Sequence, residues 1–210
     1  MISRYKYPRT MHLPWSPGWT KDDRVLKSTN HFLGQEVVVT EKMDGENTTL
    51  GRDYTHARST SSGNHISRHW LKQFHSTFGY NLPDYLRICG ENLYAQHSIA
   101  YENLPSYFLA FSVWERELCW HWDDTVDYVE KLGLSMVPIL WRGIWDEKKI
   151  VKITEQLDLS KQEGVVVRRV NAFSVEDFSL HLAKWVRSDH VTTDEHWLNK
   201  PVIPNKLRDE

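Results

Sequence analysis

Short runs of apolar and β-branched residues recur along the chain and predict strands. The clearest covers residues 36–41, which include three consecutive valines, and it ends before a turn signal at Asp44-Gly45. A second strand is predicted through residues 48–50. Five further strands are predicted at residues 87–93, 107–114, 117–122, 164–170 and 179–186.

Apolar residues at helical spacing predict three helices. One covers residues 67–78, one is capped by Asp123 or Asp124 and stops at Gly133, and one is capped by Asp146. Strands and helices do not alternate as they do in βαβ folds. The predicted fold class is therefore α+β, with antiparallel β-sheets flanked by a few helices.

Residues 1–34 lack periodicity and are rich in proline, tryptophan and turn signals, so we expect an irregular wrapping segment there. Residues 35–187 carry the regular pattern and form the expected core, followed by a short tail at 188–210. No linker divides the chain, which predicts a single domain over residues 1–210.

Composition narrows the setting. The chain has 210 residues, of which 40% are hydrophobic and 26% charged, values ordinary for a globular domain. It shows no signal peptide and no apolar run long enough to span a bilayer. Cys89 and Cys119 have no CxxC spacing, so a reduced, cytoplasmic setting is expected. A formal charge of -2 neither favours nor excludes a polynucleotide substrate.

The first chemical signal is Lys42-Met43-Asp44-Gly45, at the end of the strongest predicted strand. Lysine becomes a nucleophile when burial or a neighbouring cation lowers its pKa, and glycine lets backbone approach a phosphate closely. Alone this pattern is weak, since charged hairpin turns resemble it.

Further motifs follow in a fixed order. Arg58 lies in a His-Ala-Arg-Ser run, Glu91 in Gly-Glu at a strand end and Phe111 in an aromatic strand. Glu163 heads Glu-Gly-Val-Val-Val, and Lys184 lies in the last predicted strand.

Taken together, residues 41–187 resemble the covalent nucleotidyltransferase superfamily of DNA ligases, RNA ligases and mRNA capping enzymes. Glu41 and Asn47 are similar to the pattern around the lysine in the phage nick-sealing RNA ligase branch. The resemblance implies a nucleotidyltransferase (ligase adenylation domain) fold and an ATP-dependent RNA ligase. Lys42 would take AMP from ATP, pass it to a 5′-phosphate end, and a 3′-hydroxyl would then displace it.

The same resemblance implies the roles of the other residues. Lys184 and Arg58 would bind phosphate oxygens, Glu163 would help to hold Mg²⁺ or Mn²⁺, and Glu91 would bind the ribose. Phe111 would stack on adenine, and backbone near Thr40 and Glu41 would read the adenine edge. The nucleic-acid partner would carry 5′-phosphate and 3′-hydroxyl ends, with RNA favoured.

Three features depart from the family pattern. Val186 stands where a second lysine is usual, and the adjacent Arg187 is the candidate to replace its charge. Ser112 replaces an acidic residue that often follows the stacking aromatic. The chain ends 23 residues after Arg187, too few for an OB-fold. Substrate contacts would then come from residues 1–34, from insertions rich in tryptophan and histidine, or from an accessory protein or domain.

Several alternatives stay open. A DNA ligase, a capping-type guanylyltransferase and a non-catalytic nucleic-acid end-binding module share these motifs. Glu91 and Glu163 also suit a glycosidase pair, although the lysine and arginine motifs would then be unexplained. His65 and His69 have the spacing of zinc ligands but lack a third ligand nearby. The loop at 58–72 is either a phosphate-binding loop or a solvated one.

Overall fold

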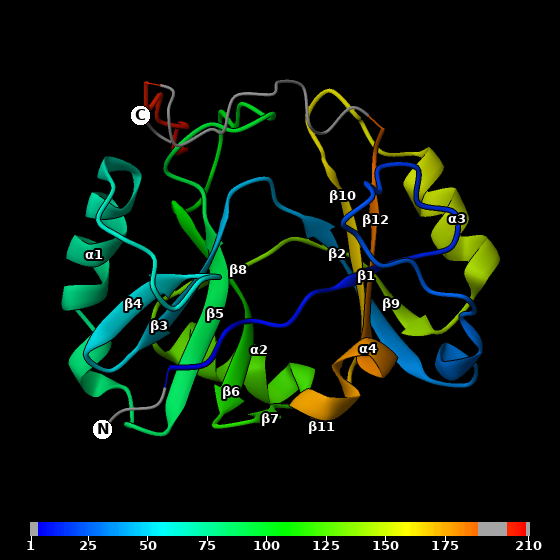
Figure 1. The fold of residues 1–210 in the computed structure, drawn as a ribbon, viewed down its shortest axis with the longest axis horizontal. Coiled ribbons are helices and arrows are strands. Elements are labelled where there is room, and N and C mark those ends of the chain that lie inside the picture. The colour runs from blue at the N-terminus through cyan, green and yellow to red at the C-terminus, as the bar shows by residue number, and fades with distance from the viewer. Residues whose placement is uncertain (1–3, 189–200, 209–210) are drawn as a thin grey trace.

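Two β-sheets form the framework of the computed structural model, which describes residues 4–188 and 201–208. Figure 1 shows the sheets facing one another across the middle of the molecule. The five-stranded sheet has the order β1 (Met11–His12), β12 (Leu182–Val186), β10 (Gly164–Arg169), β2 (Glu36–Lys42), β9 (Ile139–Ile144).

The seven-stranded sheet has the order β11 (Phe173–Ser174), β7 (Leu118–Cys119), β6 (Phe108–Glu115), β5 (Leu86–Asn92), β3 (Glu46–Gly51), β4 (Tyr54–Ala57), with β8 (Ser135–Met136) beside β6. Pairing is antiparallel except for β1 with β12 and β6 with β8, which are parallel. The predicted α+β class with antiparallel sheets is confirmed.

Helices cover the outer faces of the sheets. They are α1 (His69–Ser76), α2 (Trp122–Lys131), α3 (Glu147–Glu155) and α4 (Phe178–His181), with short 3-10 turns at Asn30–Phe32, Ile66–Arg68, Gly79–Asn81 and Val175–Asp177. In Figure 1, α1 flanks the seven-stranded sheet, α3 flanks the five-stranded sheet, and α2 lies below the space between them. None of the described helices has the length and apolar character of a membrane span.

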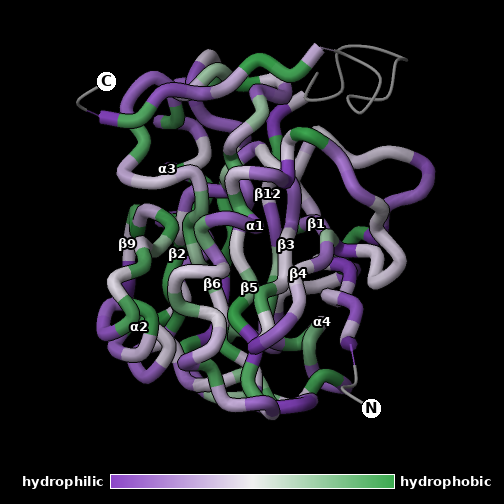
Figure 2. Tube along the Cα trace, turned by 90° about the vertical axis from the view of Figure 1, so that its left-hand side faces the viewer, coloured by the Kyte–Doolittle hydropathy of each residue, from purple (hydrophilic) through white to green (hydrophobic). Residues whose placement is uncertain are grey.

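The valine run of β2 is apolar throughout because both faces of this strand are buried. Val37 and Val39 pack into one cluster with Ile150 of α3, whereas Val38 packs into another with Trp122 of α2. Figure 2 shows hydrophobic stretches gathered in the central strands and hydrophilic ones in the peripheral loops. β2 is therefore a fixed central strand, and its last residue is Lys42.

The chain crosses from one sheet to the other immediately after Lys42. β2 ends at Lys42 in the five-stranded sheet, and β3 begins at Glu46 in the seven-stranded sheet. The turn Met43–Gly45 thus bridges the sheets, and the side chains around it come from both.

Several elements differ from the expected ones. Residues 179–181 belong to α4 rather than to a strand, and the strand expected at 117–122 shrinks to two residues because Trp122 begins α2. The cap of α2 is His121, whose side chain accepts from the Asp123 N–H. Residues 11–12, expected to be irregular, form β1.

Candidate active site

A cavity of about 420 Å³ lies between the two sheets, and we call it the intersheet cavity. Its size is that of a small-molecule site. The five-stranded sheet lines it with Thr40, Glu41, Lys42, Val166, Arg168, Leu182 and Lys184. The seven-stranded sheet adds Asn47, Glu91 and Phe111, and Arg58 follows β4. The rest of the wall comes from residues 7–10 and 22–23 and from Met43, Trp122 and Val137.

Lys42 stands opposite Gly164 of β10, and its Nζ forms an ion pair with Glu163. Burial lowers the pKa of Lys42, but the carboxylates of Glu163, Glu91 and Asp44 outweigh burial, so the pKa is raised overall. The expectation of a lowered pKa is therefore wrong for this structure. Lys42 is an ammonium here, held by a carboxylate.

Glu91 occupies the opposite side of the cavity from β12, near the end of β5. Burial, together with the nearby charges of Glu163 and Asp44, raises its pKa to about 8 despite the opposing effect of Lys42. Gly45 is needed beside it, because a Cβ there would crowd the Asn92 carbonyl and the Glu91 side chain. The carboxyl groups of Glu91 and Glu163 thus both act on the same lysine, and Glu163 is paired with it directly.

Phe111 lies at a β-bulge. Along β5 and β6, Cys89 pairs with Ser112 and Gly90 with Ala110, which leaves Phe111 as the extra residue. A bulge re-aims the side chain that it carries. Phe111 lines the cavity, and its ring meets the edge of Tyr7 at a centroid distance of 5.3 Å.

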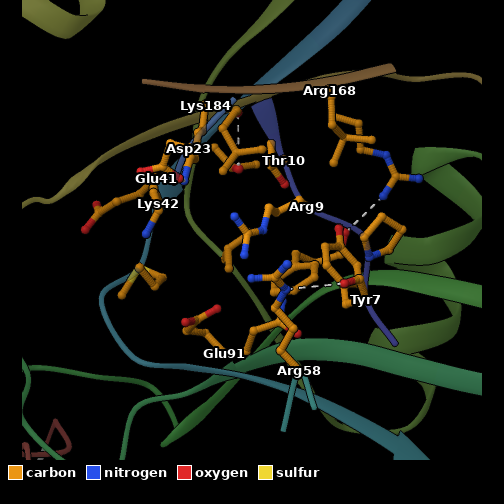
Figure 3. A pocket seen from close by; sticks show the side chains of 18 of the residues that line it. Tyr7, Arg9, Thr10, Asp23, Glu41, Lys42, Arg58, Glu91, Arg168 and Lys184 are labelled. Carbon is orange, nitrogen blue, oxygen red and sulfur yellow. Dashed lines mark hydrogen bonds and ion pairs between the residues drawn. The ribbon is translucent and has the colours of Figure 1, made fainter. Parts of the chain in front are cut away.

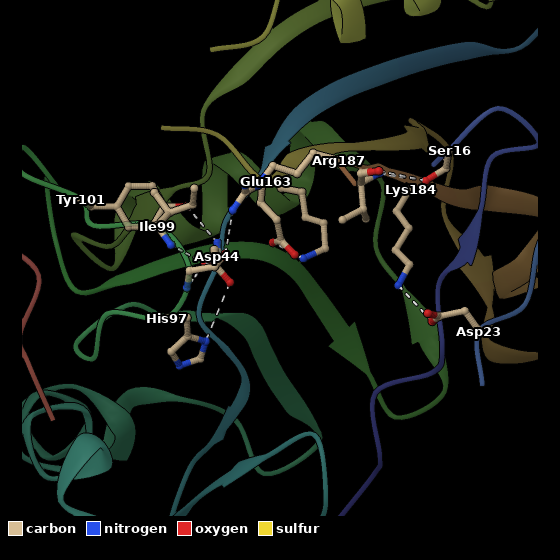
Figure 4. A network of polar contacts seen from close by, with 12 residues as sticks. Ser16, Asp23, Asp44, His97, Ile99, Tyr101, Glu163, Lys184 and Arg187 are labelled. Atoms are coloured by element: carbon tan, nitrogen blue, oxygen red, sulfur yellow. Dashed lines mark hydrogen bonds and ion pairs between the residues drawn. The ribbon is translucent and has the colours of Figure 1, made fainter. Parts of the chain in front are cut away.

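Lys184 points into the cavity from β12 and pairs with Asp23 at 3.5 Å (Figures 3 and 4). Asp23 also lies 3.6 Å from the buried His12 ring and accepts from Thr20. The hydrogen bonds from Thr20 and the charges of Lys184 and His12 lower the pKa of Asp23 to about 2 against the effect of burial. Burial lowers the pKa of Lys184.

Arg58 and Arg9 approach the cavity as two neighbouring guanidinium groups (Figure 3). Arg58 Nε donates to the Tyr7 carbonyl at 3.4 Å, and Arg9 donates to the Asp22 carbonyl at 2.6 Å. Burial and the charge of Arg9 lower the pKa of Arg58. Within the described residues neither forms an ion pair with a carboxylate, so both guanidinium groups suit an anion.

Thr40, Glu41 and Asn47 line the cavity as well. The Glu41 N–H donates to the Pro138 carbonyl at 2.9 Å, and its carboxylate accepts from Gln162 at 2.8 Å. That amide is therefore not available to read an adenine edge. The Asn47 Oδ1 is buried without a hydrogen-bond partner, so it can accept one from a ligand.

Two predicted residues lie outside the cavity wall. Glu163 reaches the site only through its ion pair with Lys42. Arg187 follows the end of β12, and its guanidinium donates to Ser98 Oγ at 3.2 Å, on the side of the Asp44 turn (Figure 4). Arg187 thus does not take the position beside Lys184 that was suggested for it, because its backbone N–H is bonded to the Glu163 carbonyl.

Sequence reasoning missed Tyr7, Arg9 and Asp23, which reach the cavity from what we call the N-terminal arm, residues 4–34. It also missed Arg168, a buried cation that lines the cavity and donates to the Phe111 and Trp120 carbonyls. The arm carries no periodic signal, so the sequence predicted substrate contacts from residues 1–34 as a whole but none of these individual residues.

The zinc site and the phosphate-binding loop at 58–72 find little geometric support. No three His, Cys, Asp or Glu side chains gather as a metal site in the described part of the chain, and His65 instead accepts from the Ser67 N–H. In the 58–72 loop, Arg68 is engaged by Glu46. His190, His196 and Trp197 lie outside the described residues.

Comparison with solved structures shows the same fold in several ligases. An archaeal ATP-dependent RNA ligase matches with a TM-score of 0.56 and 18% identity, over 82% of this chain and 48% of that one. A Naegleria gruberi RNA ligase with PPi matches with a TM-score of 0.54 and 20% identity, over 76% of this chain and 51% of that one. A putative ATP-dependent DNA ligase from Aquifex aeolicus matches with a TM-score of 0.54 and 22% identity, over 81% of this chain and 50% of that one.

Variants of the Naegleria gruberi enzyme have been solved with ATP and Mn and with AMP and Mn. This chain spans about half the length of these proteins. No curated protein matches the sequence. The RNA ligase family model matches residues 35–186, from β2 to the end of β12, and so includes every strand that brings a motif to the intersheet cavity. The chain belongs to the RNA ligase family.

Proposed function

We propose that this chain is an ATP-dependent RNA ligase in which Lys42 carries AMP. The observation that supports this most is the convergence of Lys42, Lys184 and Arg58 on one cavity that also holds Glu91 and Phe111. A nucleophile, cations for phosphate and an aromatic face are the parts that nucleotidyl transfer needs.

The adenine would occupy the apolar end of the cavity. Phe111 offers a ring face there, and Val137, Val166 and Leu182 add aliphatic surface. Tyr7 packs edge-on against Phe111 and so restricts its rotation. Asn47 Oδ1 is the polar group proposed to recognise the nucleoside, and Glu91 would bind the ribose hydroxyls.

The phosphates would occupy the cationic end. Lys184 is the principal cation near Lys42. The positive charge of Lys42 contributes to lowering the pKa of Lys184. Arg58 and Arg9 extend the positive surface toward the arm. Asp23 holds Lys184 through an ion pair, so an incoming phosphate competes with this carboxylate for the lysine.

Lys42 attacks the α-phosphorus of ATP only as a free amine, because the ammonium has no lone pair. Glu163 already accepts a hydrogen bond from Lys42 Nζ and so supplies a proton acceptor. Attack forms the Nζ–P bond and breaks the bond from the α-phosphorus to the pyrophosphate oxygen. The negative charges that raise the Lys42 pKa must be screened before the proton leaves.

A divalent cation fits the donor groups present. The carboxylates of Glu163 and Glu91 both act on Lys42, and Mg²⁺ or Mn²⁺ binds such oxygens while keeping waters and phosphate oxygens as its other ligands. Bound there, the cation would neutralise charge on the phosphates and on these carboxylates. Glu163 is our proposed protein ligand, with Glu91 beside it.

In the later steps AMP would pass to the 5′-phosphate of an RNA end, and a 3′-hydroxyl would displace it to join the strands. Arg9 and Arg58 lie where the arm meets the cavity and are candidates for contacting that end. An accessory protein or a further domain would supply additional contacts to that end. The DNA ligase similarity keeps DNA ends as an outcome of the test.

Labelling with α-³²P ATP or GTP, followed by denaturing electrophoresis, tests the first step. We expect ATP and a divalent metal to label the protein, and Lys42→Ala to abolish the label. Lys161→Ala is the matched control, since its side chain is 78% exposed and is not part of the cavity lining. Label from GTP alone would indicate a guanylyltransferase, and undiminished label in Lys42→Ala would refute the mechanism.

A ligation panel separates the later alternatives. It contains 5′-phosphorylated RNA and DNA strands, nicked and single-stranded, with and without a pre-adenylated end. Joining of RNA supports the proposal, and joining of DNA alone would make the chain a DNA ligase. Binding of ends without labelling or joining would indicate a non-catalytic module.

A further inference from the structure

Residues 201–208, which we call the C-terminal strap, dock along the loop that follows β5. The strap lies outside the residues matched by the RNA ligase family. The Gln96 N–H donates to the Ile203 carbonyl at 2.8 Å, and Leu104 exchanges backbone hydrogen bonds with Lys206 and Arg208. In Figure 1 the strap lies at the top of the molecule, beside this loop.

Asn205 anchors the strap and is only 1% exposed. Its Nδ2 donates to the Leu93 carbonyl at 2.7 Å, and its Oδ1 accepts from the Tyr101 N–H at 2.8 Å. Its backbone carbonyl accepts from the Tyr107 hydroxyl at 2.9 Å. A buried amide whose donor and acceptor are both satisfied fixes the geometry around it.

Tyr101 connects the strap to the turn that follows Lys42. Its backbone bonds Asn205 and Lys206, while its hydroxyl accepts from the Asp44 N–H at 2.9 Å. The Asp44 carboxylate in turn accepts from the Ser98 N–H and Oγ, at 2.7 Å each, and from the Ile99 N–H at 2.8 Å. Figure 4 shows Asp44 facing Ile99, Tyr101 and His97.

The apolar packing follows the same route. Met43, which lies between Lys42 and Asp44, belongs to one cluster with Leu93, Tyr101 and Leu207. Met43–Gly45 lies between the ends of β2 and β3, so ladder hydrogen bonds do not hold it. The Gly45 backbone is bonded to Glu91, whereas Asp44 is held by the loop at 97–101 and, behind that loop, by the strap.

We propose that Asn205 is a positioning residue for Lys42: through Tyr101 and Asp44, the C-terminal strap holds the turn in the conformation from which Lys42 attacks. This inference rests on the proposed function. A shift of about 1 Å in a reacting group can cost on the order of 100-fold in rate, whereas it leaves ligand affinity less affected when the ligand is held elsewhere.

The test uses three variants of the full chain. Tyr101→Phe removes only the acceptor for the Asp44 N–H, Asn205→Ala releases the strap, and Lys206→Ala is the control, since that side chain is 63% exposed. Three quantities are measured: the unfolding temperature, kcat and KM for lysine–AMP formation, and hydrogen exchange of the Asp44, Ser98 and Ile99 amides by NMR without nucleotide.

For Tyr101→Phe and Asn205→Ala we expect kcat to fall about 10-fold or more while KM for ATP stays within about twofold. Exchange of the Asp44 amide should be faster in both variants, and Lys206→Ala should match the wild type. If Asn205→Ala does not fold, Tyr101→Phe decides alone. Unchanged kcat and unchanged exchange in a folded Tyr101→Phe variant would overturn the proposal.

The exchange measurement separates the two hypotheses. If the wild type forms no lysine–AMP, the proposed function fails, yet the amide exchange still shows whether the strap holds the turn. If the wild type is labelled and exchange is unchanged in the variants, only the positioning proposal fails.

Discussion

The strands of residues 35–186 and the two segments that flank them hold their site residues in different ways. Lys42 and Lys184 stand on β2 and β12, whose register with β10 fixes both positions. Tyr7 and Asp23 of the N-terminal arm, and Asn205 of the strap, act instead through individual contacts with those residues or their supports.

The difference suggests a division of labour. The sheets carry the groups proposed to react, and the flanking segments set their charge and orientation. Asp23 forms the ion pair with Lys184, and Tyr7 contacts both Arg58 and Phe111. Asn205 supports the turn after Lys42 through Tyr101. Changes in the sheets should therefore affect the chemistry or the fold most strongly, and changes in the flanking segments should affect it by smaller factors.

The largest effect is expected for Lys184→Ala. Removing a cation that stabilises phosphate charge should slow lysine–AMP formation about 100-fold or more, measured as a single-turnover rate at saturating ATP. Lys152→Ala is the matched control, because this lysine of α3 is exposed and outside the cavity lining. An equal loss in Lys152→Ala would contradict the assignment of Lys184 to the phosphates.

Gly164→Ala should break the register on which both lysines depend. A Cβ at Gly164 would overlap the Trp185 carbonyl, so overpacking should cost about 1–3 kcal/mol of unfolding free energy. Urea unfolding measures this. Gly63→Ala, where a Cβ would meet nothing within 4 Å, should be near neutral. If the two variants had similar unfolding free energies, β10 and β12 could move apart to accept the added methyl group, and the prediction would be wrong.

In the arm, Arg9→Ala should raise KM for ATP about 10-fold, since one charge-assisted contact with phosphate is lost. Its matched control is Arg24→Ala, on the same arm but outside the cavity lining. Labelling rates over a range of ATP concentrations give KM for ATP and kcat for both variants. A normal KM with impaired joining of RNA would assign Arg9 to the nucleic-acid end instead.

A pH dependence of the free energy of unfolding is expected from Glu91. Its pKa of about 8 in the folded protein exceeds the ordinary value of 4.5, so the folded state holds the proton where the unfolded state has lost it. This contribution to stability is complete below about pH 4.5 and is lost as pH rises toward 8. Glu91→Gln should remove this part of the decline in urea unfolding, and parallel curves for both proteins would contradict it.

The sequence predicted the core of the site because each motif has a local pattern and a fixed order. Lys42, Glu91 and Lys184 lie on strands that alternation or an apolar run identifies, and the cavity brings them together. The residues 179–181 were predicted as strand because their alternation continues that of β12, yet a helical turn there leaves Leu180 exposed. Short segments of this kind do not distinguish the two states.

The contributions of the flanking segments could not be predicted in the same way. Tyr7 reaches Phe111 across 104 positions of the sequence, and Asn205 reaches Tyr101 by a contact of the same separation. Such contacts leave no periodic trace in the sequence. The bulge at Phe111 depends on the pairing of β5 with β6, and the position of Arg187 depends on a backbone hydrogen bond beyond the end of β12.

The most direct test of the central claim is peptide mass spectrometry of the protein after reaction with ATP and a divalent metal. The account predicts AMP on the peptide that contains Lys42, released by acid as expected for a phosphoramidate, and absent from Lys42→Ala. AMP on Lys184 or on an arm residue, or AMP retained in Lys42→Ala, would contradict the assignment of Lys42 as the nucleophile.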